Sequence, residues 1–216
     1  MGQIVVGANS GASILIANPS GPPSQGWRDI EGLVNAQSVS GSNPTYAAMS
    51  AGGAVRAWFY SATDILGNVY HIPHDYAPNT DIFWHLHWGH NGTNISGNIV
   101  LQVSMKYAAP YNAAPYTTEK TFALTIPATN LTVAPANSNI ISEIQITAQT
   151  AAPPTANQYD SSLFEVDGKF NVYFSVTSLP TITGGTQNNQ FFVLGADLHI
   201  QSTNLGTLNR NAPFYS

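Results

Sequence analysis

Apolar and polar side chains alternate with a period of two in a series of segments that starts at residue 54. Successive side chains of a β-strand point to opposite faces, so this alternation indicates strands with one buried face, which pair best as antiparallel neighbours. No stretch of the sequence sustains the 3.6-residue period of an amphipathic helix together with helix caps. The alternating segments are 54–60, 82–88, 98–107, 120–126, 142–148, 169–176 and 193–200.

Sequences typical of turns and long loops separate the alternating segments. They include PNTD, HNGTNISGN, APYNAAPY, AAPPTANQ and TGGTQNN. Several strands joined by such loops predict an all-β fold, an antiparallel two-sheet sandwich of jelly-roll type. We assign the sandwich to residues 54–202 and a C-terminal tail to residues 203–216.

Residues 1–53 have a different composition, rich in Gly, Ser, Asn, Pro and Ala, with two short apolar patches, QIVV and SILIA. This composition favours an extended N-terminal arm with irregular loops over a packed core segment. An arm of this kind can add a strand to the sheet edge of a neighbouring subunit. A poorly ordered terminus is the alternative, and the sequence does not favour one over the other.

Charged residues are scarce in this chain. Asp, Glu, Lys and Arg make up 8% of the residues, against about 25% in typical proteins. Because charges are depleted at the cores of protein interfaces, this composition predicts a protein that covers much of its surface with neighbours. The alternative is a monomer kept soluble by its many Asn, Thr, Ser and Gln side chains. With 6 basic residues and a net charge of −5, we expect no nucleic-acid partner.

The first residues, MGQIVVGANSGASILIANPSG, lack the basic segment of a signal peptide, and polar residues interrupt their apolar runs. We therefore expect neither a signal peptide nor a transmembrane span, no membrane partner, and synthesis in the cytoplasm. The absence of cysteine excludes disulfides, thiolate metal sites and a cysteine nucleophile. Since neither a nucleophile elbow nor a phosphate-binding glycine loop occurs, we predict that the protein is not an enzyme and carries no cofactor.

The stretch DIFWHLHWGHN, residues 81–91, is rich in histidine and tryptophan. Alternation divides its side chains between a core face and an opposite face. The core face carries Ile82, Trp84, Leu86 and Trp88, and the opposite face carries Phe83, His85 and His87. The pair Asn91-Gly92 is typical of a tight turn, so we predict a hairpin between this strand and segment 98–107.

These histidines raise the question of a metal site. Histidines at i and i+2 lie about 7 Å apart on one face, so His85 and His87 can converge on an ion with His90 or a distant acid as a further ligand. The spacing is weakly specific, and no acid follows until Glu119, whereas a cupin motif places one a few residues later. We therefore predict no bound metal and expect both rings to contact main chain or neighbouring subunits.

The aromatic residues suggest a carbohydrate-binding surface as a further alternative. Trp and Tyr rings can stack on sugar rings while Asn and Asp bind the hydroxyl groups. Large aromatics also dominate the interiors of sandwiches, and Trp84 and Trp88 lie on the predicted core face. Trp58 and the tyrosine-rich loop that contains Tyr111 stay as stacking candidates.

The end of the chain, GADLHIQSTNLGTLNRNAPFYS, combines a polar run, a lone arginine and an aromatic terminus. Arg and Tyr are favoured at protein interfaces, so this arginine is either an interface anchor or an ordinary surface residue. The residues that we predict at interfaces are Trp27, Arg28, His85, His87, Arg210, Phe214 and Tyr215.

This C-terminal sequence and the mid-chain motif DIFWHLHWGHNGTNISGNIV resemble a group of uncharacterised tailed-bacteriophage virion structural proteins. The resemblance covers only these two regions. It implies a structural component of the particle, a jelly-roll capsid decoration (cement) protein on the capsid surface. The implied partners are the major capsid protein and further copies of this chain, as a homo-trimer or homo-dimer.

Two other functions stay open at this point. The first is a receptor- or carbohydrate-binding module of a phage head or tail fibre. The second is a metal-dependent enzyme of cupin type that would use His85 and His87.

Overall fold

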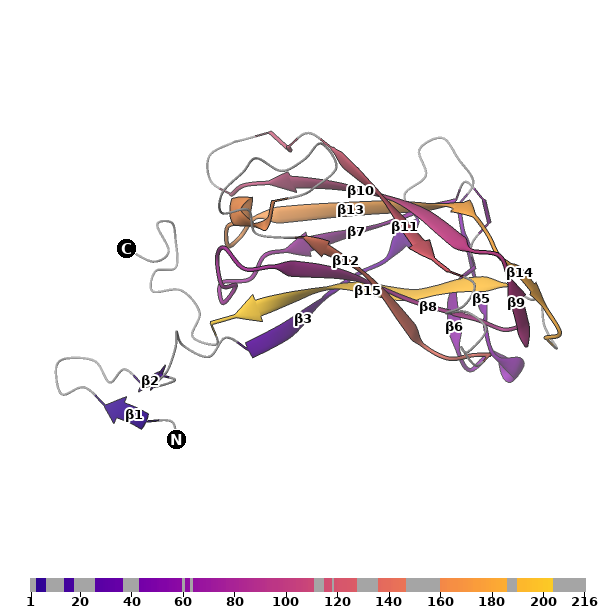
Figure 1. Cartoon of the computed structure of the whole chain (residues 1–216), viewed down its shortest axis with the longest axis horizontal. Helices are drawn as coiled ribbons and strands as arrows, with labels where there is room; N and C mark the ends of the chain where they lie inside the picture. Colours follow the sequence, from indigo (N-terminus) through magenta and orange to yellow (C-terminus); the bar gives the residue numbers. More distant parts are fainter. Residues whose placement is uncertain are drawn as a thin grey trace.

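The computed structural model describes most of the predicted sandwich. The described residues are 3–6, 14–17, 26–36, 43–59, 61–62, 64–110, 115–117, 119–127, 136–146, 160–185 and 190–203. Two antiparallel sheets lie face to face around an apolar core, with little helix beside them (Figure 1). The predicted all-β fold, an antiparallel sandwich of jelly-roll type, is confirmed. Within these ranges, no helix has the length and hydropathy that a membrane crossing requires.

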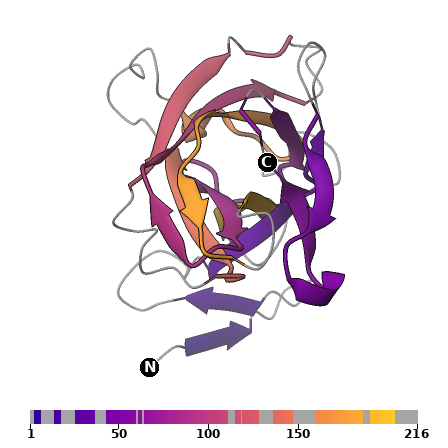
Figure 2. The ribbon, with the colours of Figure 1, turned by 90° about the vertical axis from the view of Figure 1, so that its right-hand side faces the viewer.

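The five-stranded sheet has the strand order β11, β10, β13, β7, β4. These strands are Lys120–Ile126, Ile99–Ala108, Lys169–Ser178, Ile65–His71 and Asn35–Ala36. Seen along the strands, this sheet and the second one enclose the interior between them (Figure 2).

The six-stranded sheet has the order β12, β8, β15, β6, β5, and β3 also pairs with β15. These strands are Ile140–Ile146, Ile82–His90, Phe191–Ser202, Arg56–Phe59, Thr45–Ala48 and Gly26–Gly32. Two further pairs are β9 with β14 (Asn94–Ser96 and Thr181–Thr183) and β1 with β2 (Gln3–Val6 and Ile14–Ala17). Short 3-10 turns occur at Ala51–Gly53 and Ser161–Leu163.

The predicted core faces of β8 and β10 are confirmed. On β10 the buried face consists of Ile99, Leu101, Val103, Met105 and Tyr107. On β8, Trp84 and Trp88 are fully buried, and each indole N–H is satisfied, by Tyr70 Oη at 3.1 Å and Ser142 Oγ at 3.1 Å. Burying a large apolar side chain contributes roughly 1.5–3 kcal/mol, and the paired N–H groups remove the cost of burying a polar atom.

The predicted boundary between arm and sandwich needs a correction. Strands β3, β4 and β5 lie within residues 1–53, yet they pair with β15, β7 and β6 of the two sheets. The sandwich therefore begins at Gly26 rather than at residue 54. The composition of this region hid its strands because each is short or lies at an edge, where glycine and polar residues are tolerated.

The predicted hairpin between β8 and β10 is wrong. β8 belongs to the six-stranded sheet and β10 to the five-stranded sheet, so the two strands face each other across the core. The physical reason lies at Asn91, which is buried and binds Gln190 through both its backbone and its side chain. Asn91 is thus held by the residue that precedes β15 instead of forming a two-residue turn, and β9 follows before the chain enters β10.

Alternation along segment 193–200 predicts that Leu194 shares the core face with Ala196 and Leu198, and this prediction is wrong. A β-bulge between Val193 and Gly195 shifts the register of β15 against β8. Val193 takes the core position and is fully buried, while Leu194 packs against a small separate cluster around Met49. An extra residue in one strand moves the side chains that follow it to the opposite face of the sheet, and the alternation of the sequence alone does not reveal this change.

The revised boundary predicts that two N-terminal truncations differ sharply in thermal stability. Deleting residues 1–25 leaves the sandwich folded. Deleting residues 1–53 also removes β3, β4 and β5, together with Ile30 and Val34, and so uncovers the core residues against which these two side chains pack. We expect cooperative thermal unfolding, followed by circular dichroism, near the full-length midpoint for the first truncation and a large loss for the second. An unchanged midpoint in the chain that starts at residue 54 would contradict this boundary.

Candidate functional site

Ionisable side chains gather on the outer face of the six-stranded sheet, the face turned away from the core. Alternation along the paired strands β3, β8, β12 and β15 places them there in neighbouring register positions. They are Asp29 and Glu31 of β3, His85 and His87 of β8, Glu143 of β12, and Asp197 and His199 of β15. The predicted separation of His85 and His87 from the tryptophan face of β8 is confirmed.

The proposed third histidine does not join them. His90 has the parity of Trp88 and is buried, so it lies on the other side of the strand. The alternative of a distant acid fits instead. Asp197, which pairs in register with His85 across the two strands, lies between the two imidazoles.

Asp197 contacts both histidines at short range. Its Oδ1 atom lies 3.1 Å from His85 Nδ1, and its Oδ2 atom lies 2.5 Å from His87 Nε2. The Asp197 side chain is 9% exposed, and the histidine side chains are 14% and 24% exposed. Three ionisable groups therefore share one partly desolvated position, which we call the His–Asp cluster: His85, His87 and Asp197.

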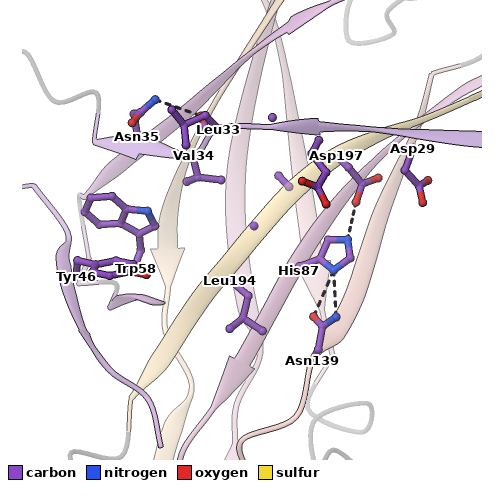
Figure 3. A pocket seen from close by; sticks show the side chains of 14 residues that line it. Asp29, Leu33, Val34, Asn35, Tyr46, Trp58, His87, Asn139, Leu194 and Asp197 are labelled. Carbon is purple, nitrogen blue, oxygen red and sulfur yellow. Dashed lines mark hydrogen bonds and ion pairs between the residues drawn. The ribbon is translucent and has the colours of Figure 1, made fainter. Parts of the chain in front are cut away.

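Neighbouring groups hold the rings of this cluster in place. His85 Nε2 lies 3.4 Å from Glu143 Oε2. His87 Nδ1 lies 3.3 Å from Asn139 Oδ1 (Figure 3). The His199 ring stacks on that of His85 with a centroid distance of 5.1 Å, and His199 is in turn paired with Asp29. Each ring is thus fixed by contacts on more than one side.

A hollow opens next to the cluster where β15 changes its edge partner. β15 pairs with β6 at Phe192 and Val193 and with β3 from Ala196 onward, so Leu194 and Gly195 have no strand beside them on that edge. We call this hollow the notch, and its volume is about 1160 Å³. It is lined by Asp29, Glu31, Gly32, Leu33, Val34, Asn35, Tyr46, Trp58, His87, Asn139, Leu194, Gly195, Ala196 and Asp197 (Figure 3).

Two aromatic rings form one wall of the notch. Tyr46 of β5 and Trp58 of β6 are paired in register, with ring centroids 5.3 Å apart in an edge-to-face arrangement. Trp58 is half-buried against the core, whereas Tyr46 is 51% exposed. Trp58, a stacking candidate from the sequence, therefore lies in the notch together with Tyr46, which sequence reasoning did not single out.

A further exposed ring lies on the outer face beyond the notch. Trp27 is 48% exposed and stacks on His199 with a centroid distance of 4.8 Å and an interplanar angle of 17°. It also meets Phe83 edge to face at 5.5 Å. Trp27, His199 and His85 thus form a continuous row of stacked rings.

The remaining predicted interface residues divide into two groups. Arg28 binds Asp75 within the chain, with 2.5 Å between Nη1 and Oδ2. Arg210, Phe214 and Tyr215 lie outside the described residues, as does the stacking candidate Tyr111. The interface role of all seven residues stays a prediction.

No family model matches this chain, and no curated protein matches it. Several solved carbohydrate-binding modules show a low level of structural similarity. A xylan-binding module, CBM15, has 10% sequence identity and a TM-score of 0.35 over 82% of this chain and 97% of that one.

Two other modules are similar at the same level. The N-terminal CBM22-1 and GH10 modules of a Clostridium thermocellum endo-1,4-beta-D-xylanase, complexed with xylohexaose, have 11% identity and a TM-score of 0.32 over 80% of this chain and 26% of that one. A family 11 carbohydrate-binding module from Clostridium thermocellum, in complex with a mixed-linked tetrasaccharide, has 14% identity and a TM-score of 0.28 over 84% of this chain and 92% of that one. Similarity at this level is too low to imply that this chain binds the same ligands.

The ion pair between Arg28, near the start of β3, and Asp75 predicts a pH dependence of stability. Burial raises the pKa of Asp75, but the hydrogen bonds from Ser202 Oγ and Arg28 outweigh burial and hold this pKa below its usual value. The ionised carboxylate therefore stabilises the fold above about pH 4, and its contribution is lost as the pH falls through the folded-state pKa. We expect Asp75→Asn to lower the melting temperature at pH 7, with a difference from the wild type that shrinks below about pH 4.

Glu31→Gln, at an exposed acid of the same strand β3, is the matched control and should change the melting temperature little. Equal effects of the two variants at pH 7 would contradict the assignment.

Proposed function

We propose that this protein binds a neutral carbohydrate chain in the notch and along the neighbouring outer face of the six-stranded sheet. The observation that carries the proposal is the composition of the notch, where an exposed tyrosine and a tryptophan face carboxylates and an amide across one hollow. Sugar rings offer an apolar face that packs on aromatic rings and a rim of hydroxyl groups that need hydrogen-bond partners. Binding sites typically combine aromatic walls with a few polar groups in this way.

The size of the notch supports an extended ligand. Small-molecule sites typically have volumes of about 300–1,000 Å³, and the notch reaches about 1160 Å³. The outer face continues from it toward Trp27, a second exposed ring stacked on His199. An oligosaccharide could therefore contact Tyr46 with one unit and Trp27 with another.

The charge of the lining favours a neutral ligand. Asp29, Glu31 and Asp197 all line the notch, and carboxylates at close range repel the acid groups of uronic or sialic acids. The two exposed carboxylates, Asp29 and Glu31, accept hydrogen bonds from sugar hydroxyl groups in this proposal, and such charge-assisted bonds are stronger than neutral ones. Asn139 and His87 add further polar groups to the lining.

A glycan array on the purified chain tests the proposal. We expect selective binding of neutral oligosaccharides, and a loss of about tenfold in affinity for Tyr46→Ala because an exposed stacking ring is removed, equivalent to about 1.4 kcal/mol. Tyr116→Ala is the matched control, since Tyr116 is 49% exposed and lies outside the notch. Binding confined to acidic glycans, or equal losses in both variants, would overturn the proposal.

Gly195 offers a second test that removes no binding group. A Cβ atom added there meets no heavy atom within 4 Å, so a larger side chain is accommodated and projects into free space. Gly195→Leu should therefore keep the melting temperature and abolish glycan binding. Unchanged affinity in this folded variant would place the ligand elsewhere.

The virion role stays a proposal beside this one, and a head-surface protein can also bind glycans. Besides the resemblance, the observation that favours it is a chain with few charged residues that exposes apolar side chains, including Leu33 at 76% and Val69 and Ile141 at 53%. Such side chains are typical of surfaces covered by partner proteins. The proposed partners are the major capsid protein and further copies of this chain, and binding without catalysis is part of the proposal.

Copy number in purified particles tests the virion role. Near-stoichiometry with the major capsid protein is expected for a capsid decoration protein, because such a protein occupies equivalent lattice positions. A small number of copies would point to the tail or a fibre. Absence from particles would overturn the virion proposal and leave the glycan proposal untouched.

A further inference from the structure

The His–Asp cluster carries an inference that is independent of carbohydrate binding. Asp197 is 6% exposed overall, and its Oδ1 atom is buried without a hydrogen bond of acceptable geometry among the described residues. His85 Nδ1 lies 3.1 Å from this oxygen, close enough for an ionic contact but not aligned as a donor. A buried carboxylate oxygen without a hydrogen bond is costly unless a cation satisfies it.

Lysine and arginine do not supply that cation in the described part of the chain. There, the ion pairs of Asp197, Asp29 and Glu143 all run to histidines. Arg28 is paired with Asp75 and Lys106 with Glu119. Several carboxylates thus share one face with imidazoles as their partners, and either protons or a metal ion must bridge them.

The outer contacts of the two rings suit metal ligands. Metal-binding histidines usually donate the second ring N–H to a carboxylate or a carbonyl, which leaves the other nitrogen free to bind the ion. His85 has Glu143 at Nε2, and His87 has the Asn139 amide at Nδ1, with Oδ1 at 3.3 Å and Nδ2 at 3.2 Å. In this structure a proton bridges His87 Nε2 and Asp197 Oδ2, which are hydrogen-bonded at 2.5 Å. A metal ion that displaces this proton would leave Glu143 and Asn139 Oδ1 to accept the outer N–H groups, while the inner nitrogens of both imidazoles bind the ion.

The candidate ligand atoms also lie close enough together to bind one metal ion. One atom each from His85, His87 and Asp197 forms a group in which all atoms lie within 4.8 Å of one another. Around a tetrahedral ion with bonds of about 2.0–2.1 Å, ligand atoms lie roughly 3.3 Å apart. The pair of His85 Nδ1 and Asp197 Oδ1, at 3.1 Å, is close to this value. His87 Nε2 and Asp197 Oδ2 are 2.5 Å apart, so these two atoms must separate by somewhat less than about 1 Å when the ion replaces the proton between them.

We propose that His85, His87 and Asp197 bind one divalent first-row transition metal ion, a class that imidazole and carboxylate ligands suit. This proposal replaces the expectation from sequence that the chain holds no metal, and it replaces His90 by Asp197 as the third ligand. Asp29 and His199 form a second, overlapping group with His85. Because Asp29 is the more exposed of the two acids, at 59% against 9% for Asp197, the ion belongs with Asp197.

Isothermal titration of the full-length, EDTA-treated protein with ZnCl₂, without any glycan, tests the proposal. We expect one ion per chain, and at least a tenfold loss of affinity in Asp197→Asn and in His87→Gln. Asp167→Asn is the matched control, since Asp167 Oδ1 also contacts two histidines, His71 at 2.9 Å and His74 at 3.0 Å. Among the described residues, two groups have ligand atoms that all lie within 4.8 Å of one another, and Asp167, His71 and His74 form neither of them.

Two further readouts keep the outcome clear. Circular dichroism establishes that each variant is folded, and Co²⁺ in place of Zn²⁺ should give visible absorption bands in the wild type that His87→Gln and Asp197→Asn lose. The proposal is overturned by an absence of saturable Zn²⁺ binding, which would leave protons as the bridge, or by equal losses in Asp167→Asn and Asp197→Asn. Because no sugar is present, either result leaves the carbohydrate proposal standing.

Discussion

The change of partner along one edge of β15 shapes most of this molecule. β15 pairs with β8 along one side, while its other side pairs first with β6 and then with β3. The bulge at Leu194 lies at the point of change, and a bulge leaves a residue unpaired and bends its strand. β6 and β3, which pair with successive parts of the same edge, therefore separate at this point, and the notch is the space between them.

Residues at the end of β3 make that divergence possible. The chain leaves the six-stranded sheet at Gly32 and enters β4 of the five-stranded sheet at Asn35. At Gly32 the backbone passes against the ring of Tyr70, where an added Cβ atom would lie 2.4 Å from Cε1. Only glycine fits such an approach without displacing a buried ring. The aromatic wall of the notch then comes from β5 and β6, which occupy the edge that β3 has left.

The same strands serve two opposite purposes. On β8, Trp84, Leu86 and Trp88 fill the core while His85 and His87 point outward, so one strand both stabilises the sandwich and supplies the ionisable cluster. Among the acids of this outer face, Asp197 is the exception because it is buried. Its position between two imidazoles compensates part of the cost of that burial, and it gives the metal and carbohydrate proposals a shared wall.

The periodicity of the sequence was enough to predict the fold class and the buried faces of β8, β10 and β13. It also predicted that His85 and His87 point away from the core. These features follow from the two-residue repeat of a strand, which is a local property. The sheet to which each strand belongs, the parity change at Leu194, and the strands of residues 26–48 depend on partners far away in the chain. The site is non-local in the same way: Asp197 reaches His87 across 110 residues, and Tyr46 meets Trp58 only because β5 and β6 pair. Alternation states which way a side chain points, but the pairing of distant strands sets what it faces.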